Sequence, residues 1–160
     1  MKNVLILCTG NSCRSIMAEG LLNHYGQGRF TAFSAGSHPS GFVHPMSLVT
    51  MAANGIKTEG CRSKSWDEFT DKRLDVVITV CDNAAGETCP VFFGAPVKAH
   101  WGVSDPAHFK GTEAEVKAEF QRVFDILAVR VKALIALPDD LDKATFTAKL
   151  NEIGKLCPHP

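Results

Sequence analysis

The chain has 160 residues, in which 17 lysine and arginine residues balance 17 aspartate and glutamate residues, and 45% of the residues are hydrophobic. This length suits one domain with a full core, and the balanced charge excludes a global attraction to nucleic acid or to an anionic membrane surface. No apolar run approaches the ~18 residues of a membrane span, and the first residues run straight into a strand pattern. We therefore expect a cytoplasmic protein that contacts neither nucleic acid nor membrane.

Strand and helix patterns alternate from the start of the chain. The apolar run Val4–Leu7 is typical of a strand buried on both faces. A helical pattern begins at Ser15 and ends at Gly26, which suits a C-cap, and its predicted buried side consists of Met17, Leu21 and Tyr25. Phe30–Ala35 predicts a second strand, closed by Gly36.

Three further elements follow in the middle of the chain. Pro45 suits a first helical turn, Asn54 and Gly55 stop that helix, and its predicted buried side consists of Met46, Val49 and Ala53. Leu74–Val80 predicts the third strand, and Val97–Trp101 predicts a short fourth strand.

Two helices are predicted near the C-terminus. Thr112 and Glu115 have the spacing of a capping box, and the apolar positions after them predict a long helix that ends near Pro138. We expect one domain over residues 1–137 and a C-terminal extension over residues 138–160. The extension has the pattern of one added amphipathic helix through Phe146, Leu150 and Ile153.

This alternation predicts an α/β fold, a small doubly wound, flavodoxin-like parallel sheet of four strands in the order 2-1-3-4, flanked by helices. In such a sheet, ligands bind at the carboxyl ends of the strands where the strand order reverses. Cys8 leaves the first strand, Cys81 leaves the third strand, and Asp105 follows the fourth. We therefore expect these three residues to lie at one pocket.

The segment between the first strand and the first helix predicts a pocket for a tetrahedral oxyanion. Its backbone N–H groups and the positive end of the helix can point at one anion, so the predicted substrate-binding residues are Thr9, Gly10, Asn11, Ser12, Cys13 and Arg14. Arg14 supplies a planar fork of donors for two oxygens. Cys8 is the predicted nucleophile, because these features favour a thiolate, and Ser15 is placed to hydrogen-bond its sulfur. The alternative for Cys8 is a buried structural thiol.

Asp105, which precedes Pro106, is a candidate general acid for a departing oxygen. The alternative is an ordinary loop aspartate that starts a turn. The six cysteines, at 8, 13, 61, 81, 89 and 157, suggest reactive thiols more than a secreted disulfide framework. Seven residues separate Cys81 from Cys89, which is not the spacing of a zinc finger, and we expect no metal ligands.

These motifs resemble the low-molecular-weight tyrosine phosphatase fold and, within it, the thioredoxin-coupled arsenate reductases. The resemblance runs from Val4 to Leu137. The resemblance rests on seven motifs, which are the loop from Cys8 to Ser15, Met17-Ala18-Glu19-Gly20, Ser34-Ala35-Gly36, Cys81 with Cys89-Pro90, His100-Trp101-Gly102, Asp105-Pro106-Ala107 and Phe120-Gln121-Arg122-Val123.

The resemblance implies reduction of arsenate to arsenite, in arsenic detoxification, by a relay of three thiols. Cys8 would attack arsenate bound by Arg14, with Asp105 assisting loss of an oxygen. Cys81 would then attack Cys8, and Cys89 would attack Cys81. Reduced thioredoxin would regenerate the enzyme, with a glutathione and glutaredoxin system as the alternative electron donor. We expect no bound cofactor and a monomer.

Two positions depart from the resembled pattern. The relay cysteines are commonly separated by six residues, whereas seven separate them here. Some relatives bind potassium through positions that correspond to Asn11, Glu19, Ser34 and an aspartate, and Lys64 stands in place of that aspartate. The Lys64 ammonium is therefore expected to replace the cation.

Two other functions compete with arsenate reduction. A tyrosine phosphatase would use Cys8 and Asp105 without relay thiols, and it would favour an aromatic residue where this chain has Ala107. A thiol redox sensor would switch by forming a bond between Cys8 and Cys81, but it would leave Arg14 unexplained.

Overall fold

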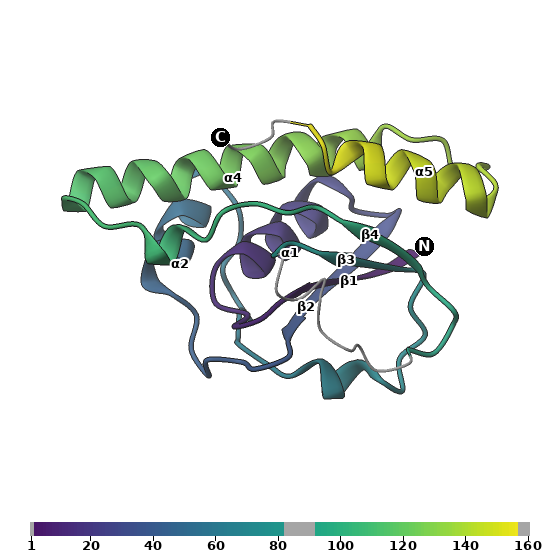
Figure 1. Ribbon diagram of the computed structural model, residues 1–160, viewed down its shortest axis with the longest axis horizontal. Coiled ribbons are helices and arrows are strands. Elements are labelled where there is room, and N and C mark those ends of the chain that lie inside the picture. The colour runs from purple at the N-terminus through teal and green to yellow at the C-terminus, as the bar shows by residue number, and fades with distance from the viewer. Residues whose placement is uncertain (1, 82–91, 157–160) are drawn as a thin grey trace.

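The computed structural model describes residues 2–81 and 92–156 (Figure 1). The elements are, in order, β1 Lys2–Cys8, α1 Arg14–Tyr25, β2 Phe30–Gly36, α2 Pro45–Ala53, the 3-10 helix η1 Trp66–Phe69, β3 Val76–Thr79, β4 Val97–His100, the 3-10 helix η2 Pro106–His108, α4 Glu113–Ile135 and α5 Lys143–Ile153. Every predicted strand and helix is therefore present.

The four strands form one parallel sheet in the order β2-β1-β3-β4, which confirms the predicted topology. Cys8 is the last residue of β1 and pairs with Gly36 at the end of β2. Leu7 pairs with Thr79 at the end of β3. The loops that follow β1 and β3 therefore leave the same edge of the sheet side by side, at the point where the strand order reverses.

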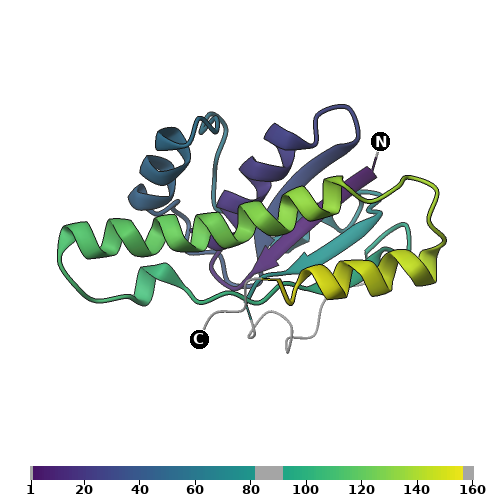
Figure 2. The ribbon, with the colours of Figure 1, turned by 90° about the horizontal axis from the view of Figure 1, so that it is seen from above.

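The larger part of the core lies between the sheet and the α-helices. Val4 and Ile6 of β1 pack on this face with apolar residues of α1, α4 and α5. Figure 2 shows α4 running across this layer, with α5 beside it. On the opposite face, Leu5 and Leu7 pack in a smaller cluster with Phe69 of η1. Both faces of β1 are thus buried, as its continuous apolar run predicts.

Three details of the predicted elements are wrong. The third strand is shorter than Leu74–Val80, since β3 spans Val76–Thr79. Tyr25 in α1 is 42% exposed, because it stands at the end of the helix, where the chain turns at Gly26. Val49 in α2 is 46% exposed, and Ala53 is exposed too.

The buried side of α2 contains Ser47, Thr50 and Met51 instead. The Ser47 hydroxyl donates to the Ser12 carbonyl at 3.1 Å, and the Thr50 hydroxyl donates to the Met46 carbonyl at 2.7 Å. Polar side chains can be buried when their hydrogen bonds are made, so a pattern of apolar residues alone assigns the wrong side to this helix.

The C-terminal part follows the prediction closely. The capping box of α4 is present, with hydrogen bonds in both directions between Thr112 and Glu115. Phe146, Leu150 and Ile153 form the buried side of α5. The division of the chain at residue 137 stays a prediction. Among the helices of the described residues, none combines the length and the apolarity needed to cross a bilayer.

Candidate active site

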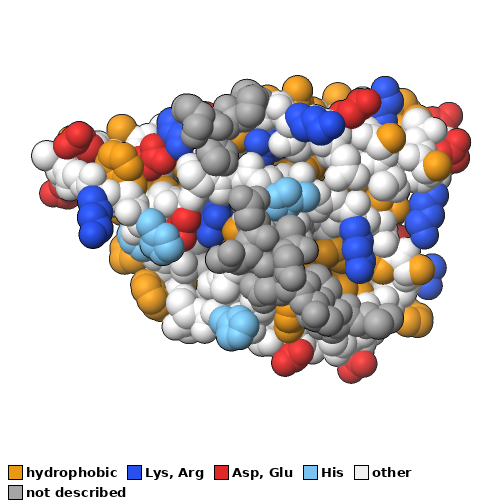
Figure 3. Space-filling model, viewed as in Figure 1, with side chains coloured by type: hydrophobic (Ala, Val, Ile, Leu, Met, Phe, Trp, Pro, Cys, Tyr) orange, Lys and Arg blue, Asp and Glu red, His pale blue; other side chains and the backbone are white. Residues whose placement is uncertain are grey.

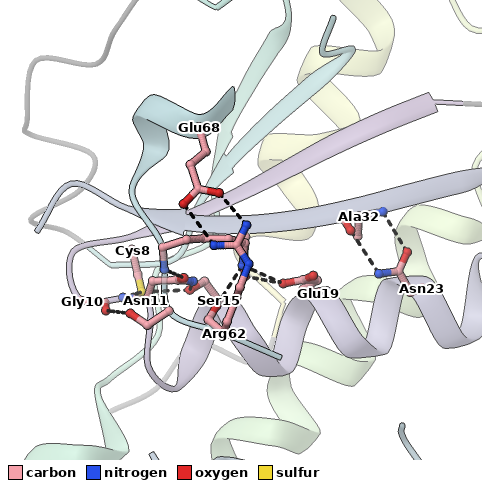
Figure 4. A network of polar contacts seen from close by, with 12 residues as sticks. Cys8, Gly10, Asn11, Ser15, Glu19, Asn23, Ala32, Arg62 and Glu68 are labelled. Carbon is pink, nitrogen blue, oxygen red and sulfur yellow. Dashed lines mark hydrogen bonds and ion pairs between the residues drawn. The ribbon is translucent and has the colours of Figure 1, made fainter. Parts of the chain in front are cut away.

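The loop from Cys8 to Arg14 curls around the Cys8 sulfur. The Asn11 backbone N–H donates to Cys8 Sγ at 3.2 Å, and the Ser15 hydroxyl lies 3.0 Å from the same sulfur. Figure 4 shows Cys8, Gly10, Asn11 and Ser15 gathered beside the start of α1. Two hydrogen-bond donors are therefore available to a thiolate at Cys8, as expected for Ser15 from the sequence.

The carbonyl groups of this loop point away from its centre, toward neighbouring segments. The Thr9 carbonyl accepts from the His38 N–H at 3.0 Å, and the Ser12 carbonyl accepts from the His44 N–H at 3.0 Å. The Gly10 carbonyl accepts from the Ser40 N–H at 2.9 Å. In a trans peptide, a carbonyl and the N–H that follows it point in opposite directions. The N–H groups after these carbonyls consequently face inward, which forms a cradle for an anion.

Asn11 holds the loop to its surroundings. This side chain is fully buried, its amide donates to Ser15 Oγ at 2.8 Å, and its carbonyl oxygen accepts from the Lys64 backbone N–H at 2.9 Å. Its φ of 47° lies in the left-handed region, which asparagine tolerates better than most residues. Asn11 therefore has a structural task in addition to the predicted contribution of its backbone.

Gly36 provides the close packing of β2 against the loop. A Cβ at this position would lie 2.4 Å from the Thr9 carbonyl oxygen, and the Gly36 N–H donates to the Lys64 carbonyl at 2.9 Å. This contact gives a physical reason for the glycine in Ser34-Ala35-Gly36, one of the motifs on which the family resemblance rests.

Arg14 of the loop and Asp105 form an ion pair. Arg14 Nη1 donates to the Val103 carbonyl at 3.0 Å, and Nη2 lies 3.4 Å from Asp105 Oδ2. Asp105 Oδ1 accepts from the Ala107 N–H at 3.0 Å, so Asp105 also caps η2. The predicted anion-binding and acid residues are thus brought together. Val103 was not predicted, because its role belongs to a backbone carbonyl.

His108 also borders this pair, with Nε2 3.6 Å from Asp105 Oδ2. Sequence reasoning missed it, although its place three residues after a candidate acid at a turn is a usable signal. Figure 3 shows acidic and basic side chains both present on the face of Figure 1, and histidine side chains exposed near its centre and on its left half. Any preference for anions must therefore arise locally at the loop, as the balanced charge predicts.

Cys81 lies against the same loop. It is buried, and its Sγ is 3.5 Å from Thr9 Oγ1. The predicted approach of the third strand's cysteine to the loop of the first strand is observed. Cys89, the predicted third relay thiol, lies outside the described residues, and so does Cys157.

Lys64 and Glu19 form a largely buried polar cluster behind the loop. Lys64 is 8% exposed, and its Nζ lies 3.4 Å from Ser34 Oγ and 3.8 Å from Glu19 Oε1. The Ser34 hydroxyl donates to Glu19. Burial raises the pKa of Glu19, which Lys64 partly offsets, and burial lowers the pKa of Lys64, which Glu19 partly offsets. In the described residues, no group of three or more histidine, cysteine, aspartate or glutamate side chains is arranged to hold a metal ion.

Two other thiols have pKa values above that of an ordinary cysteine. Burial raises the pKa of Cys13 and also that of Cys61. The side chain of Cys13 is packed in the core, as expected, so only its backbone is placed to take part in anion binding. A raised pKa leaves fewer thiolates at neutral pH, and reactivity falls accordingly.

A family model, Low molecular weight phosphotyrosine protein phosphatase, matches residues 3–149. The chain belongs to this family. It is 38% identical over 131 residues to an arsenate reductase of Halalkalibacterium halodurans, a match that covers 82% of this chain and 93% of that relative. It is 39% identical to an arsenate reductase of Bacillus subtilis, with the same coverage of both chains.

Solved structures agree with this assignment. An arsenate reductase in the phosphate binding state has a TM-score of 0.70 and 34% sequence identity, and the match covers 85% of this chain and 98% of that structure. The family fold and the resemblance predicted from the motifs are therefore confirmed.

Proposed function

We propose that this member of the low-molecular-weight phosphatase family reduces arsenate to arsenite. The observation that carries the proposal is a second thiol, Cys81, against the oxyanion loop that surrounds Cys8. A hydrolase needs only the first thiol. Relatives named arsenate reductase support this choice of substrate.

In the first step, the Cys8 thiolate attacks arsenic while the loop N–H groups and Arg14 bind the remaining oxygens. A bond forms between Cys8 Sγ and arsenic, and one arsenic–oxygen bond breaks. Asp105 donates the proton that lets this oxygen leave as water. The Ser15 hydroxyl and the Asn11 N–H stabilise the charge at sulfur before the attack.

The electrons move in the second step. The Cys81 thiolate attacks Cys8 Sγ, a disulfide bond forms, and the sulfur–arsenic bond breaks with its electron pair on arsenic. Arsenic is thereby reduced from the +5 to the +3 state and leaves as arsenite, while two thiols are oxidised. Cys89 then attacks Cys81 and releases Cys8 as a thiolate, which leaves a disulfide between Cys81 and Cys89.

The electron donor that reduces this disulfide is proposed to be thioredoxin, without a bound cofactor. One structural relative is a thioredoxin-dependent arsenate reductase of Corynebacterium glutamicum, at 26% identity with a TM-score of 0.58, where the match covers 82% of this chain and 62% of that structure. Glutaredoxin with glutathione is the alternative donor. A cytoplasmic location and a monomeric state stay predictions.

Lys64 is proposed to take the place of a bound cation. Its ammonium lies between Ser34 and Glu19, and its backbone N–H binds Asn11. A fixed positive charge in this position would hold the loop without potassium. Equal activity in sodium and in potassium buffers is the expected result.

Phosphate ester hydrolysis is the second candidate function, because the family's name and the pairing of Arg14 with Asp105 favour it. The relay thiols separate the two functions. Purified protein with thioredoxin, thioredoxin reductase and NADPH should oxidise NADPH only when arsenate is added. Cys81→Ser and Cys89→Ser should each abolish this oxidation and leave hydrolysis of p-nitrophenyl phosphate largely intact.

Cys61→Ser is the matched control, since this partly buried thiol belongs to neither the loop nor the relay. It should leave both activities unchanged. Absence of arsenate-dependent NADPH oxidation with either electron donor would rule out the reductase and leave the hydrolase.

A further inference from the structure

The five residues from Trp101 to Asp105 include the contacts of Arg14 outside the oxyanion loop. Arg14 donates to the Val103 carbonyl at 3.0 Å and lies 3.4 Å from Asp105. The orientation of the Arg14 guanidinium therefore depends on where this segment, called here the rim segment, holds its backbone.

A second arginine also binds the rim segment. Arg130 of α4 is 1% exposed, and its Nη1 donates to the carbonyls of Trp101 at 2.9 Å and Gly102 at 3.0 Å. These two carbonyls directly precede the Val103 carbonyl that Arg14 binds. The planar guanidinium has donors at fixed angles, so it fixes the orientation of consecutive peptide groups where a lysine ammonium cannot.

Arg130 also connects the rim segment to the C-terminal part of the chain. Its Nε donates to the Leu156 carbonyl at 3.0 Å, and the Trp101 indole N–H donates to the Leu150 carbonyl at 2.9 Å. A Cβ at Gly154 would lie 2.3 Å from the His100 carbonyl oxygen, so the end of α5 packs directly on the end of β4. Figures 1 and 2 show α4 and α5 side by side over the sheet. The family match ends at residue 149, before Gly154 and Leu156.

We propose that Arg130 is a positioning residue for the oxyanion site and that it couples the C-terminal segment to Arg14. Arg130 fixes the peptide groups of Trp101 and Gly102, these fix the Val103 carbonyl, and that carbonyl orients the Arg14 guanidinium toward the anion. Asp105 follows two residues later and is set by the same segment. This role rests on the proposed function, because it concerns the same anion site. It requires only that this site binds a tetrahedral oxyanion, whether or not arsenate is reduced there.

The test compares Arg130→Lys with Arg29→Lys. Arg29 is a matched control, because it too binds backbone carbonyls, those of Ile135 and Leu137 at the end of α4, and neither residue belongs to the rim segment. Inorganic phosphate bound at the oxyanion loop should protect Cys8 from iodoacetamide, and peptide mass spectrometry measures the alkylation of Cys8 as phosphate is added. The melting temperature of each variant is recorded alongside.

Arg130→Lys should weaken phosphate binding about tenfold, the equivalent of losing one well-oriented charged contact. Arg29→Lys should lower the melting temperature and leave the phosphate dissociation constant unchanged. A merely structural role for Arg130 would give both variants the same unchanged phosphate affinity, and that result would overturn the proposal.

Gly154→Ala is the second variant, and it keeps the test decisive if Arg130→Lys does not fold. Its added methyl group pushes the end of α5 from the His100 carbonyl and draws the Leu156 carbonyl away from Arg130, so phosphate affinity should fall to a smaller extent. An unchanged affinity in Gly154→Ala would contradict the coupling. Failure of arsenate reduction in the wild type, with phosphate binding still weakened in Arg130→Lys, would refute the reductase and leave the positioning role standing.

Discussion

Asn11 offers the sharpest test of how the oxyanion loop is held. Asn11→Ala removes the acceptor of the buried Lys64 N–H and the donor to Ser15 Oγ, which are bonds of 2.9 and 2.8 Å. An unsatisfied buried N–H costs about 1–3 kcal/mol, and a second lost hydrogen bond costs about 1 kcal/mol. Alanine at a left-handed φ of 47° adds about 1 kcal/mol. We expect the free energy of unfolding to fall by about 4 kcal/mol, the middle of the range that these three contributions add up to.

Urea denaturation of the wild type, Asn11→Ala and Asn11→Gly measures this loss and divides it into its causes. Glycine loses the same two hydrogen bonds but adopts the left-handed region freely, so Asn11→Gly should be more stable than Asn11→Ala by about 1 kcal/mol. Arsenate reduction should be slow in both variants, because Ser15 loses the donor that orients its hydroxyl toward Cys8. A loss below about 1 kcal/mol in Asn11→Ala would refute the assigned hydrogen bonds.

Two further outcomes follow from the geometry around the loop. Gly36→Ala places a methyl carbon 2.4 Å from the Thr9 carbonyl oxygen, so the loop must shift, and phosphate protection of Cys8 against alkylation should weaken. Gly28→Ala is the control: its φ of 84° also strains an alanine, but it lies in the turn between α1 and β2 with no atom within 4 Å of the added Cβ, so it should leave phosphate protection unchanged. The pKa of Glu19 is raised in the folded state. The stability that this shift contributes is therefore fully present below the unfolded pKa of about 4.3, and it is lost as the pH rises through the pKa of the folded state. In urea denaturation from pH 4 to 7, the stability of the wild type relative to Glu19→Gln should therefore decline as the pH rises, and an increase would show that the shift has the opposite sign.

The sequence predicts the fold well where one physical signal dominates. The unbroken apolar run in β1 reflects burial on both faces of the sheet, and the capping box of Thr112 and Glu115 marks the start of α4 directly. Prediction fails where two signals compete. In α2, Ser47 and Thr50 are buried because their hydroxyls bind backbone carbonyls, while Val49 is exposed. A pattern of apolar residues contains no information about such hydrogen bonds.

The same limit divides the candidate site into predictable and unpredictable parts. Cys8, Arg14 and Ser15 follow from the motif because their side chains carry the proposed chemistry, and topology alone brings Cys81 and Asp105 to the same edge of the sheet.

The atoms that orient these groups belong to the backbone and lie far away in sequence. Arg14 depends on a carbonyl 89 residues later, and the Lys64 N–H that Asn11 binds is 53 residues away. Any residue can present a carbonyl or an N–H, so no residue type marks these positions. The identity of the neighbouring side chains matters only through the space that they leave, as at Gly36, or through the peptide groups that they fix, as at Arg130. Variants at such positions should therefore alter anion affinity even though they contact no substrate, and motif comparison alone would overlook them.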